Sequence, residues 1–249
     1  MSVHFVGAGP GAADLITLRA ASLLAAADVV LYPGTYLDAE VLSHCPDARL
    51  VDTQTLDLDR ITSVMVDASA EGFEVVRLTS GDPSLYSALA EQTARLDAAG
   101  VAWDVCPGVP AYAAAAAAVG RELTVPLVAQ SVVLTRTQAR STAMPESESL
   151  AAFAATRATL VLHLAITRTR ELAASLVDEY GADCPAVVVH HASQPDEFVL
   201  RGTLSDIAEQ VEAAGLRQAA VILVGRALAR DGAESWLYQA DRLRASAES

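Results

Sequence analysis

Three short turns rich in glycine and proline have the residue types and spacing that could bind a nucleotide-like ligand. They are Gly7-Ala8-Gly9-Pro10-Gly11, Ser80-Gly81-Asp82-Pro83 and Pro107-Gly108-Val109-Pro110, and each follows a short apolar run. Small residues let the backbone approach a ligand closely. If the apolar runs are parallel strands, the turns lie at the carboxyl edge of one sheet, where open α/β sheets bind ligands. We therefore predict one shared pocket lined by backbone.

The first turn is compatible with two classes of cofactor. Gly7, Gly9 and Ala12 match the G-x-G-x-x-G/A pattern of dinucleotide-binding proteins. That pattern also needs an acidic residue at the end of the second strand, which here ends at Tyr32 without one. Pro10 removes one backbone N–H, which disfavours a pyrophosphate. A ligand without phosphates is favoured, and a dinucleotide or a purely structural strand-to-helix turn are the alternatives.

Two further polar residues have a structural and a functional interpretation. Asp82 stands in an Asp-Pro-Ser sequence that is typical of a helix cap, and the same carboxylate could contact a ligand. His163 lies in an apolar strand and is interpreted as a buried, hydrogen-bonded histidine rather than a catalyst. The sequence shows no Ser-His-Asp or H-E-x-x-H pattern. We therefore predict no particular catalytic residue and no metal site.

Arginines follow two of the strands expected in the second half of the chain. Arg136 and Arg140 follow the strand at 131–135, and Arg168 and Arg170 follow the strand at 159–164. A guanidinium binds a carboxylate through two parallel hydrogen bonds. These residues therefore indicate where an anionic substrate could bind, and the alternative is that they are solvated arginines paired with nearby acids.

The composition narrows the class of protein. The 249 residues carry a formal charge of −14 and are 52% hydrophobic, which permits a large core and disfavours nucleic acid or an anionic membrane as partner. All 17 basic residues are arginine, so lysine-dependent chemistry is excluded. The cysteines at 45, 106 and 184 form no paired motif and Met1 leads directly into strand-like sequence. We therefore expect reduced cysteines, no signal peptide and a cytoplasmic protein.

Strand and helix patterns alternate along the chain, which predicts an α/β fold. In the first half the expected strands are 3–6, 29–32, 50–52, 74–79 and 103–106, and the expected helices are 17–27, 59–71, 84–99 and 110–119. In the second half the expected strands are 131–135, 159–164, 186–190, 198–201 and 220–224. We predict two domains, 1–119 and 127–249, joined by a linker at about 120–126. Each is expected to hold a mainly parallel or mixed sheet flanked by helices.

These motifs together resemble a known family. The opening GAGPG…DLITL, SGDPSLY at 80–86 and PGVPA at 107–111 are similar to the tetrapyrrole (corrin/porphyrin) methyltransferases, over nearly the full length of the chain. Within the family, RELTVP at 121–126 and QSVVLTR at 130–136 resemble the members that methylate carbon 11 of precorrin-4. The chain departs from the family at Ala12, where aspartate is usual. It also has Pro33 where some relatives carry an aspartate proposed as a base.

The resemblance implies an S-adenosylmethionine-dependent C-methyltransferase of cobalamin biosynthesis that acts as a homodimer, with the cofactor in a cleft between the domains. Its implied substrate is precorrin-4 or cobalt-precorrin-4. Another precorrin or uroporphyrinogen methyltransferase is the alternative, and an NAD-dependent dehydrogenase is a distant one. Carried over by motif, the cofactor contacts are Pro10, Ser80, Gly81, Asp82, Leu85, Pro110, Ala111, Leu164, Ala192, Ala220 and Ile222. Arg121, Arg136 and Arg140 are expected to bind substrate carboxylates.

Overall fold

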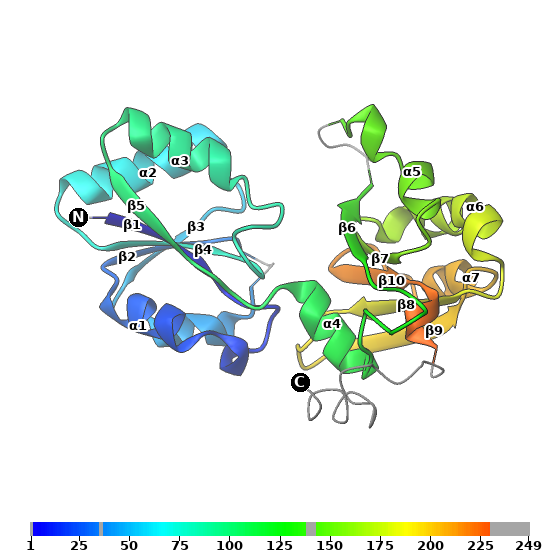
Figure 1. The fold of residues 1–249 in the computed structure, drawn as a ribbon. Coiled ribbons are helices and arrows are strands. Elements are labelled where there is room, and N and C mark those ends of the chain that lie inside the picture. Colours follow the sequence, from blue (N-terminus) through cyan, green and yellow to red (C-terminus); the bar gives the residue numbers. More distant parts are fainter. Residues whose placement is uncertain (1, 35–36, 138–142, 230–249) are drawn as a thin grey trace, which may run out of the picture. The chain divides into compact units, whose positions relative to one another are not determined.

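The computed structural model describes residues 2–34, 37–137 and 143–229 (Figure 1). The chain divides into two compact units, each with its own sheet. The first consists of Met1–Ala114 and His191–Glu197, and the second of Ala115–His190 and Phe198–Ser249. The predicted bounds, 1–119 and 127–249, do not include the return of His191–Glu197 to the first unit.

The first unit is built on a five-stranded sheet of order β3-β2-β4-β1-β5, in which all neighbouring strands run parallel. Its strands are β1 (Ser2–Gly7), β2 (Val29–Tyr32), β3 (Arg49–Asp52), β4 (Val75–Thr79) and β5 (Ala102–Cys106). Its helices are α1 (Leu18–Ala26), α2 (Leu58–Ala70) and α3 (Leu89–Ala98). The parallel sheet predicted from the alternation of strands and helices is confirmed.

Helices cover both faces of this sheet, which explains why its inner strands β1, β2 and β4 are mostly apolar and buried. Side chains alternate between the faces of a strand, so in β1 the side chain of Phe5 packs with Met65 of α2 and Leu96 of α3. The next residue, Val6, packs in a separate cluster with Leu24 of α1. Figure 1 shows α2 and α3 on one side of the sheet and α1 on the other.

The second unit holds a five-stranded mixed sheet of order β6-β7-β10-β8-β9. Its strands are β6 (Val132–Arg136), β7 (Thr159–His163), β8 (Pro185–His190), β9 (Phe198–Thr203) and β10 (Ala220–Val224). Only β6 and β7 are parallel to each other. Its helices are α5 (Leu150–Ala154), α6 (Thr169–Tyr180) and α7 (Ile207–Ala213), and the first unit gives way to the second within α4 (Ala111–Val119). Residues from α5, α6 and α7 share one core with the strands β7, β8 and β10, so the predicted mixed architecture is confirmed.

Short 3-10 helices complete the described structure, at Ala13–Leu15, Ala39–His44, Glu146–Glu148, Ile166–Arg168 and Arg226–Leu228. Within residues 2–34, 37–137 and 143–229, no helix combines the length and apolar character needed to cross a bilayer.

The helix predicted at 84–99 is wrong at its start, because α3 begins only at Leu89. Tyr86 and Ala88 have φ angles of +54° and +55°, a left-handed conformation that a right-handed helix cannot contain. The residue before the helix is Ala88, which makes no side-chain cap. Asp82 therefore caps no helix, and that interpretation of it is wrong.

Candidate functional site

The three glycine and proline turns meet at the carboxyl edge of the first sheet. They follow β1, β4 and β5, which are neighbouring strands. The Gly81 N–H donates to the Gly9 carbonyl at 2.7 Å, and the Gly9 N–H donates to the Gly81 carbonyl at 3.2 Å. A Cβ at Gly108 would lie 2.2 Å from the Gly81 oxygen and 2.8 Å from the Gly7 Cα. Glycine is therefore required for this backbone contact, and the predicted meeting of the turns is confirmed.

Several predicted cofactor contacts are brought together at this edge. Pro10 is buried next to the Gly9–Gly81 bridge. Gly81 has a φ of +68°, and a Cβ there would lie 3.6 Å from the Ala111 nitrogen and 3.7 Å from the Pro110 Cα. These residues present backbone and small apolar groups rather than charged side chains. Ser80 and Leu85, which flank this turn, are exposed and half-buried respectively.

Asp82 joins the second turn to the third. Its Oδ1 accepts hydrogen bonds from the Ser84 N–H at 2.8 Å and from the Ser84 hydroxyl, and its Oδ2 accepts from the Gly108 N–H at 2.8 Å. Burial alone would raise the pKa of Asp82, but these hydrogen bonds outweigh burial and hold the pKa below its ordinary value. The carboxylate is therefore ionised at neutral pH, and both of its oxygens bind the protein.

A buried arginine supports the segment that follows the second turn. Arg77 in β4 is 8% exposed, and its guanidinium donates to the Gln92 side-chain oxygen at 3.1 Å and to the Leu78 carbonyl at 2.9 Å. The Gln92 amide in turn donates to the carbonyls of Ser87 and Ala88, both at 3.1 Å. Burial lowers the pKa of Arg77 to about 10, so it stays charged at neutral pH. The sequence did not indicate this network.

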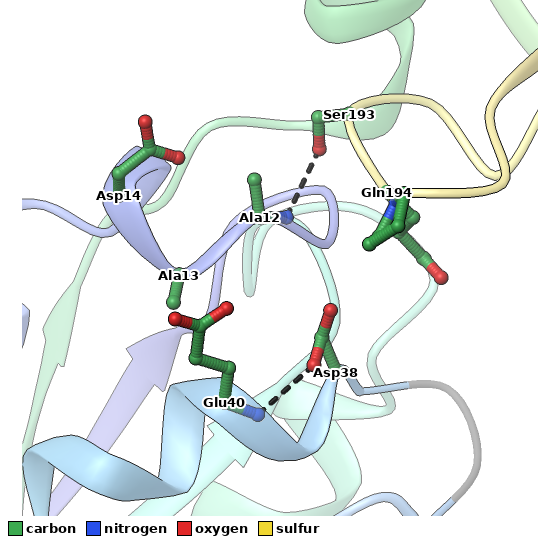
Figure 2. Close-up of a pocket in the computed structure, with 8 residues that line it drawn as sticks. Ala12, Ala13, Asp14, Asp38, Glu40, Ser193 and Gln194 are labelled. Carbon is green, nitrogen blue, oxygen red and sulfur yellow. Dashed lines mark hydrogen bonds between the residues drawn. The ribbon is translucent and has the colours of Figure 1, made fainter.

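A segment far along the chain contacts the first turn (Figure 2). The Ser193 hydroxyl accepts a hydrogen bond from the Ala12 N–H at 3.1 Å. The Gln194 side chain packs on Gly11, where a Cβ would lie 2.3 Å from the Gln194 Cγ. Ala192, a predicted cofactor contact, is buried in the same segment. No pattern in the sequence predicted a role for Ser193 or Gln194.

An acidic cavity of about 260 Å³ lies beside this contact. Figure 2 shows the carboxylates of Asp14, Asp38 and Glu40 among its lining residues, which also include Ala12, Ala13, Ser193, Gln194 and Pro195. The Asp38 carboxylate accepts a hydrogen bond from the Glu40 N–H at 2.9 Å. Negative charge disfavours a carboxylate-bearing ligand, so this cavity does not suit an anionic substrate.

In the second unit, three predicted site residues lie at one end of the sheet. Arg136 pairs in register with His163 at the end of β7, and Ala220 starts the antiparallel strand β10. Leu164 directly follows β7, has a φ of +52° and is 64% exposed. Strained residues of this kind are concentrated at functional sites. Ile222 differs, because its side chain is 2% exposed and packs in the core under the helices, and its backbone pairs with Leu162 on one side and Val188 on the other.

Arg121 lies at the opposite end of the same sheet. Its Nε donates to the carbonyl of Leu228 at 3.1 Å. Leu228 ends the 3-10 helix that comes after Val224, the last residue of β10, whereas Ala220 is the first residue of that strand. The structure therefore does not bring Arg121 and Arg136 together. Arg140 lies outside the described residues. The substrate-binding roles of all three arginines stay predictions.

Two other arginines singled out by position have carboxylate partners. Arg168 pairs with Glu171, and the Arg170 Nη2 lies 2.7 Å from the Glu212 Oε2. Their interpretation as surface arginines paired with nearby acids is confirmed.

His163 is half-buried, and burial lowers its pKa, so it is neutral at neutral pH.

The architecture and turns are those of a methyltransferase. The model of the family Tetrapyrrole (Corrin/Porphyrin) Methylases matches residues 2–208, and the chain belongs to this family.

Individual relatives narrow the comparison. The precorrin-4 C(11)-methyltransferase of Rhodococcus erythropolis is 55% identical over 246 residues, which cover 98% of this chain and 99% of that protein. The X-ray structure of a cobalt precorrin-4 methyltransferase, a cobalamin biosynthetic enzyme, matches with a TM-score of 0.88 and 38% identity, over 92% of this chain and 96% of that one. Uroporphyrin-III C-methyltransferase from Thermus thermophilus, complexed with S-adenosylhomocysteine, matches with a TM-score of 0.76 and 28% identity, over 92% and 99% of the two chains.

Proposed function

We propose that this chain is an S-adenosylmethionine-dependent methyltransferase that methylates carbon 11 of precorrin-4 in cobalamin biosynthesis. The observation that carries the proposal is the 55% identity, over 98% of the chain, to the Rhodococcus precorrin-4 C(11)-methyltransferase. The meeting of the three turns at the carboxyl edge of the first sheet supports it, because open α/β sheets bind their ligands at this edge.

The residues at this edge fit S-adenosylmethionine better than a dinucleotide. Pro10 has no N–H, and the Gly9 N–H already donates to the Gly81 carbonyl, so the first turn offers few donors to a pyrophosphate. The small groups of Pro110 and Ala111 beside Gly81 suit a ligand held by backbone contacts and apolar packing. The relative that binds S-adenosylhomocysteine supports the same cofactor. An NAD-dependent dehydrogenase is disfavoured by the same contacts.

The proposed cofactor contacts are those carried over from the family's motifs: Pro10, Ser80, Gly81, Asp82, Leu85, Pro110, Ala111, Leu164, Ala192, Ala220 and Ile222. Among these, Asp82 acts through the turns that it holds together, because both of its oxygens already accept hydrogen bonds from Ser84 and Gly108.

S-adenosylmethionine supplies a methyl group already activated by the sulfonium, so the protein's task is to align the two reactants and exclude water. Alignment of this kind is worth up to about 7–11 kcal/mol. The fixed backbone of the three turns provides a rigid surface for that purpose. The reaction needs no strong acid–base pair from the chain.

Arg136 is the described arginine best placed to bind a substrate carboxylate, because it lies at the same end of the second sheet as Leu164 and Ala220. Arg121 and Arg140 are proposed as further carboxylate contacts. Replacing Arg136 by glutamine is expected to raise the KM for precorrin-4 about tenfold, since a charge-assisted hydrogen bond contributes about 1.5–3 kcal/mol, and to leave the KM for S-adenosylmethionine unchanged.

We propose that the substrate carries no cobalt. The support is the higher identity to the protein named for precorrin-4 (55%) than to the structure named for cobalt precorrin-4 (38%). A methylation assay followed by mass spectrometry, with precorrin-4 and cobalt-precorrin-4 as parallel substrates, tests this directly. A higher kcat/KM for the cobalt complex would contradict the assignment.

Cofactor class is tested separately by calorimetry with S-adenosylhomocysteine and with NAD. Binding and thermal stabilisation are expected with S-adenosylhomocysteine alone. Stabilisation by NAD alone would overturn the proposal, and methylation of uroporphyrinogen III rather than precorrin-4 would move the chain to another member of the family. The proposed homodimer and cytoplasmic location are tested by sedimentation equilibrium and by cell fractionation.

A further inference from the structure

We propose that the segment His191–Glu197 positions the first glycine turn, with Ser193 and Gln194 as the positioning residues. Cofactor affinity would then depend on these two side chains through the backbone of Gly11 and Ala12. The inference rests on the proposed function, because it takes the turn that contains Pro10 as a cofactor contact.

The first contact fixes the backbone of Ala12. The Ser193 hydroxyl accepts the Ala12 N–H at 3.1 Å. Ala12 immediately precedes the 3-10 helix Ala13–Leu15 and supplies no side-chain cap of its own. The Ser193 hydroxyl therefore anchors the chain at the point where it leaves the glycine turn (Figure 2).

The second contact fixes Gly11. A Cβ at Gly11 would lie 2.3 Å from the Gln194 Cγ and 2.9 Å from its Cδ. The φ angle of Gly11 is not positive, so its backbone conformation would tolerate alanine. A larger residue at Gly11 would therefore have to displace the Gln194 side chain, and this makes the contact testable by paired substitutions.

The segment is itself held in a defined shape. The Ser193 N–H donates to the Glu197 carboxylate at 2.7 Å, and the His191 Nδ1 lies 2.8 Å from the Asp196 Oδ2. His191 and Ser193 have φ angles of +47° and +69°, a conformation that costs a non-glycine residue about 1 kcal/mol or more. Such conformations persist only where surrounding contacts fix them. The segment is therefore a preorganised support rather than a loose connection.

The first test removes the hydroxyl in Ser193→Ala. Loss of one hydrogen bond predicts S-adenosylhomocysteine binding weakened about threefold to tenfold in calorimetry. The KM for S-adenosylmethionine is expected to rise by the same factor, while kcat and the KM for precorrin-4 stay within about twofold of the wild type. The matched control is Ser175→Ala, which removes a hydroxyl bonded to the Leu172 carbonyl in α6 and is expected to leave cofactor affinity unchanged.

The second test is a double-mutant cycle between Gly11→Ala and Gln194→Ala. Gly11→Ala is expected to weaken S-adenosylhomocysteine binding about tenfold in the wild-type chain, because the new methyl group collides with the Gln194 side chain. In the Gln194→Ala background the same substitution is expected to change affinity less than about twofold. An equal loss in both backgrounds would show that Gln194 does not position Gly11.

The outcomes separate this inference from the proposed function. If the wild type fails to bind S-adenosylhomocysteine, both the proposed function and this inference are wrong. If the wild type binds and Ser193→Ala binds equally well, only the positioning role is wrong. Should Gly11→Ala fail to fold by circular dichroism, the Ser193→Ala and Ser175→Ala pair decides alone.

Discussion

Asp82 illustrates how a single side chain can hold a binding surface together by joining two of its turns. Its two oxygens accept three hydrogen bonds from Ser84 and Gly108. The sequence indicated a helix cap or a ligand contact, and neither pattern described this bridge between two turns. A carboxylate that accepts several hydrogen bonds is stabilised in its ionised form, in agreement with its lowered pKa.

We predict that Asp82→Asn lowers the free energy of unfolding by about 1 kcal/mol at about pH 7, since one charge-assisted acceptor is lost at a partly exposed site. The folded pKa lies below the ordinary value of about 3.9. The carboxylate's contribution is therefore fully present above that value and is lost as the pH falls through the folded pKa.

Urea unfolding from about pH 7 down to about pH 3 measures this prediction. The difference between wild type and Asp82→Asn is expected to shrink below about pH 4. Glu71→Gln is the control, because Glu71 is exposed and its substitution should change little at any pH. A difference that stays constant over the whole range would show that the charge of Asp82 does not contribute.

The sheet elements could be predicted from the sequence because each has a local signature. Continuous apolar runs followed by helical patterns marked the strands of the first sheet, and the turns after β1, β4 and β5 marked its binding edge. The start of α3 could not be predicted in this way. Left-handed conformations at Tyr86 and Ala88 have no signature in those residue types. The Gln92 amide that donates to the Ala88 carbonyl also accepts from Arg77 of β4, a contact that no local pattern predicts.

The candidate site was predicted only in part for the same reason. Its backbone residues, Pro10, Gly81 and Pro110, lie in turns with a recognisable sequence. Ser193 and Gln194 contact the first turn although more than half of the sequence separates them from it. No periodic pattern in a sequence predicts such a contact. The two ends of β10 also separate Arg121 from Arg136, which their proximity in sequence could not reveal.

The packing of the three turns makes a strong prediction for Gly108→Ala. The new methyl group would lie 2.2 Å from the Gly81 oxygen and 2.8 Å from the Gly7 Cα, and these are backbone atoms that cannot rotate away. We expect a loss of about 2–3 kcal/mol in the free energy of unfolding, measured by urea titration, together with weakened S-adenosylhomocysteine binding.

Gly72→Ala is the matched control for this substitution. Gly72 has a φ of +87° and nothing lies within 4 Å of a Cβ built there, so its cost is the backbone strain alone, about 1 kcal/mol. Cofactor binding should not change. Equal destabilisation by both substitutions would show that the turns can separate without penalty.

The whole chain carries a charge of −14, and its cationic side chains are all arginines. The proposed substrate bears carboxylates, so the net field of the protein repels it while Arg136 attracts it locally. Screening separates the two contributions, because the Debye length falls from about 30 Å at 0.01 M salt to about 8 Å at 0.15 M. At low salt the substrate senses the charge of the whole molecule, and at higher salt it senses mainly the arginines near its binding site.

We therefore predict that kcat/KM for precorrin-4 rises about threefold or more between about 0.01 M and 0.15 M NaCl, as the long-range repulsion is screened. Steady-state assays at fixed, saturating S-adenosylmethionine measure the effect. S-adenosylhomocysteine has no net charge at neutral pH, so its calorimetric affinity should change little and serves as the control. In Arg136→Gln, kcat/KM is expected to be lower than in the wild type at every salt concentration. It should still rise with salt, because screening acts on the remaining negative charge. A steady fall of kcat/KM with salt in the wild type would show that local arginines dominate the approach of the substrate at every distance.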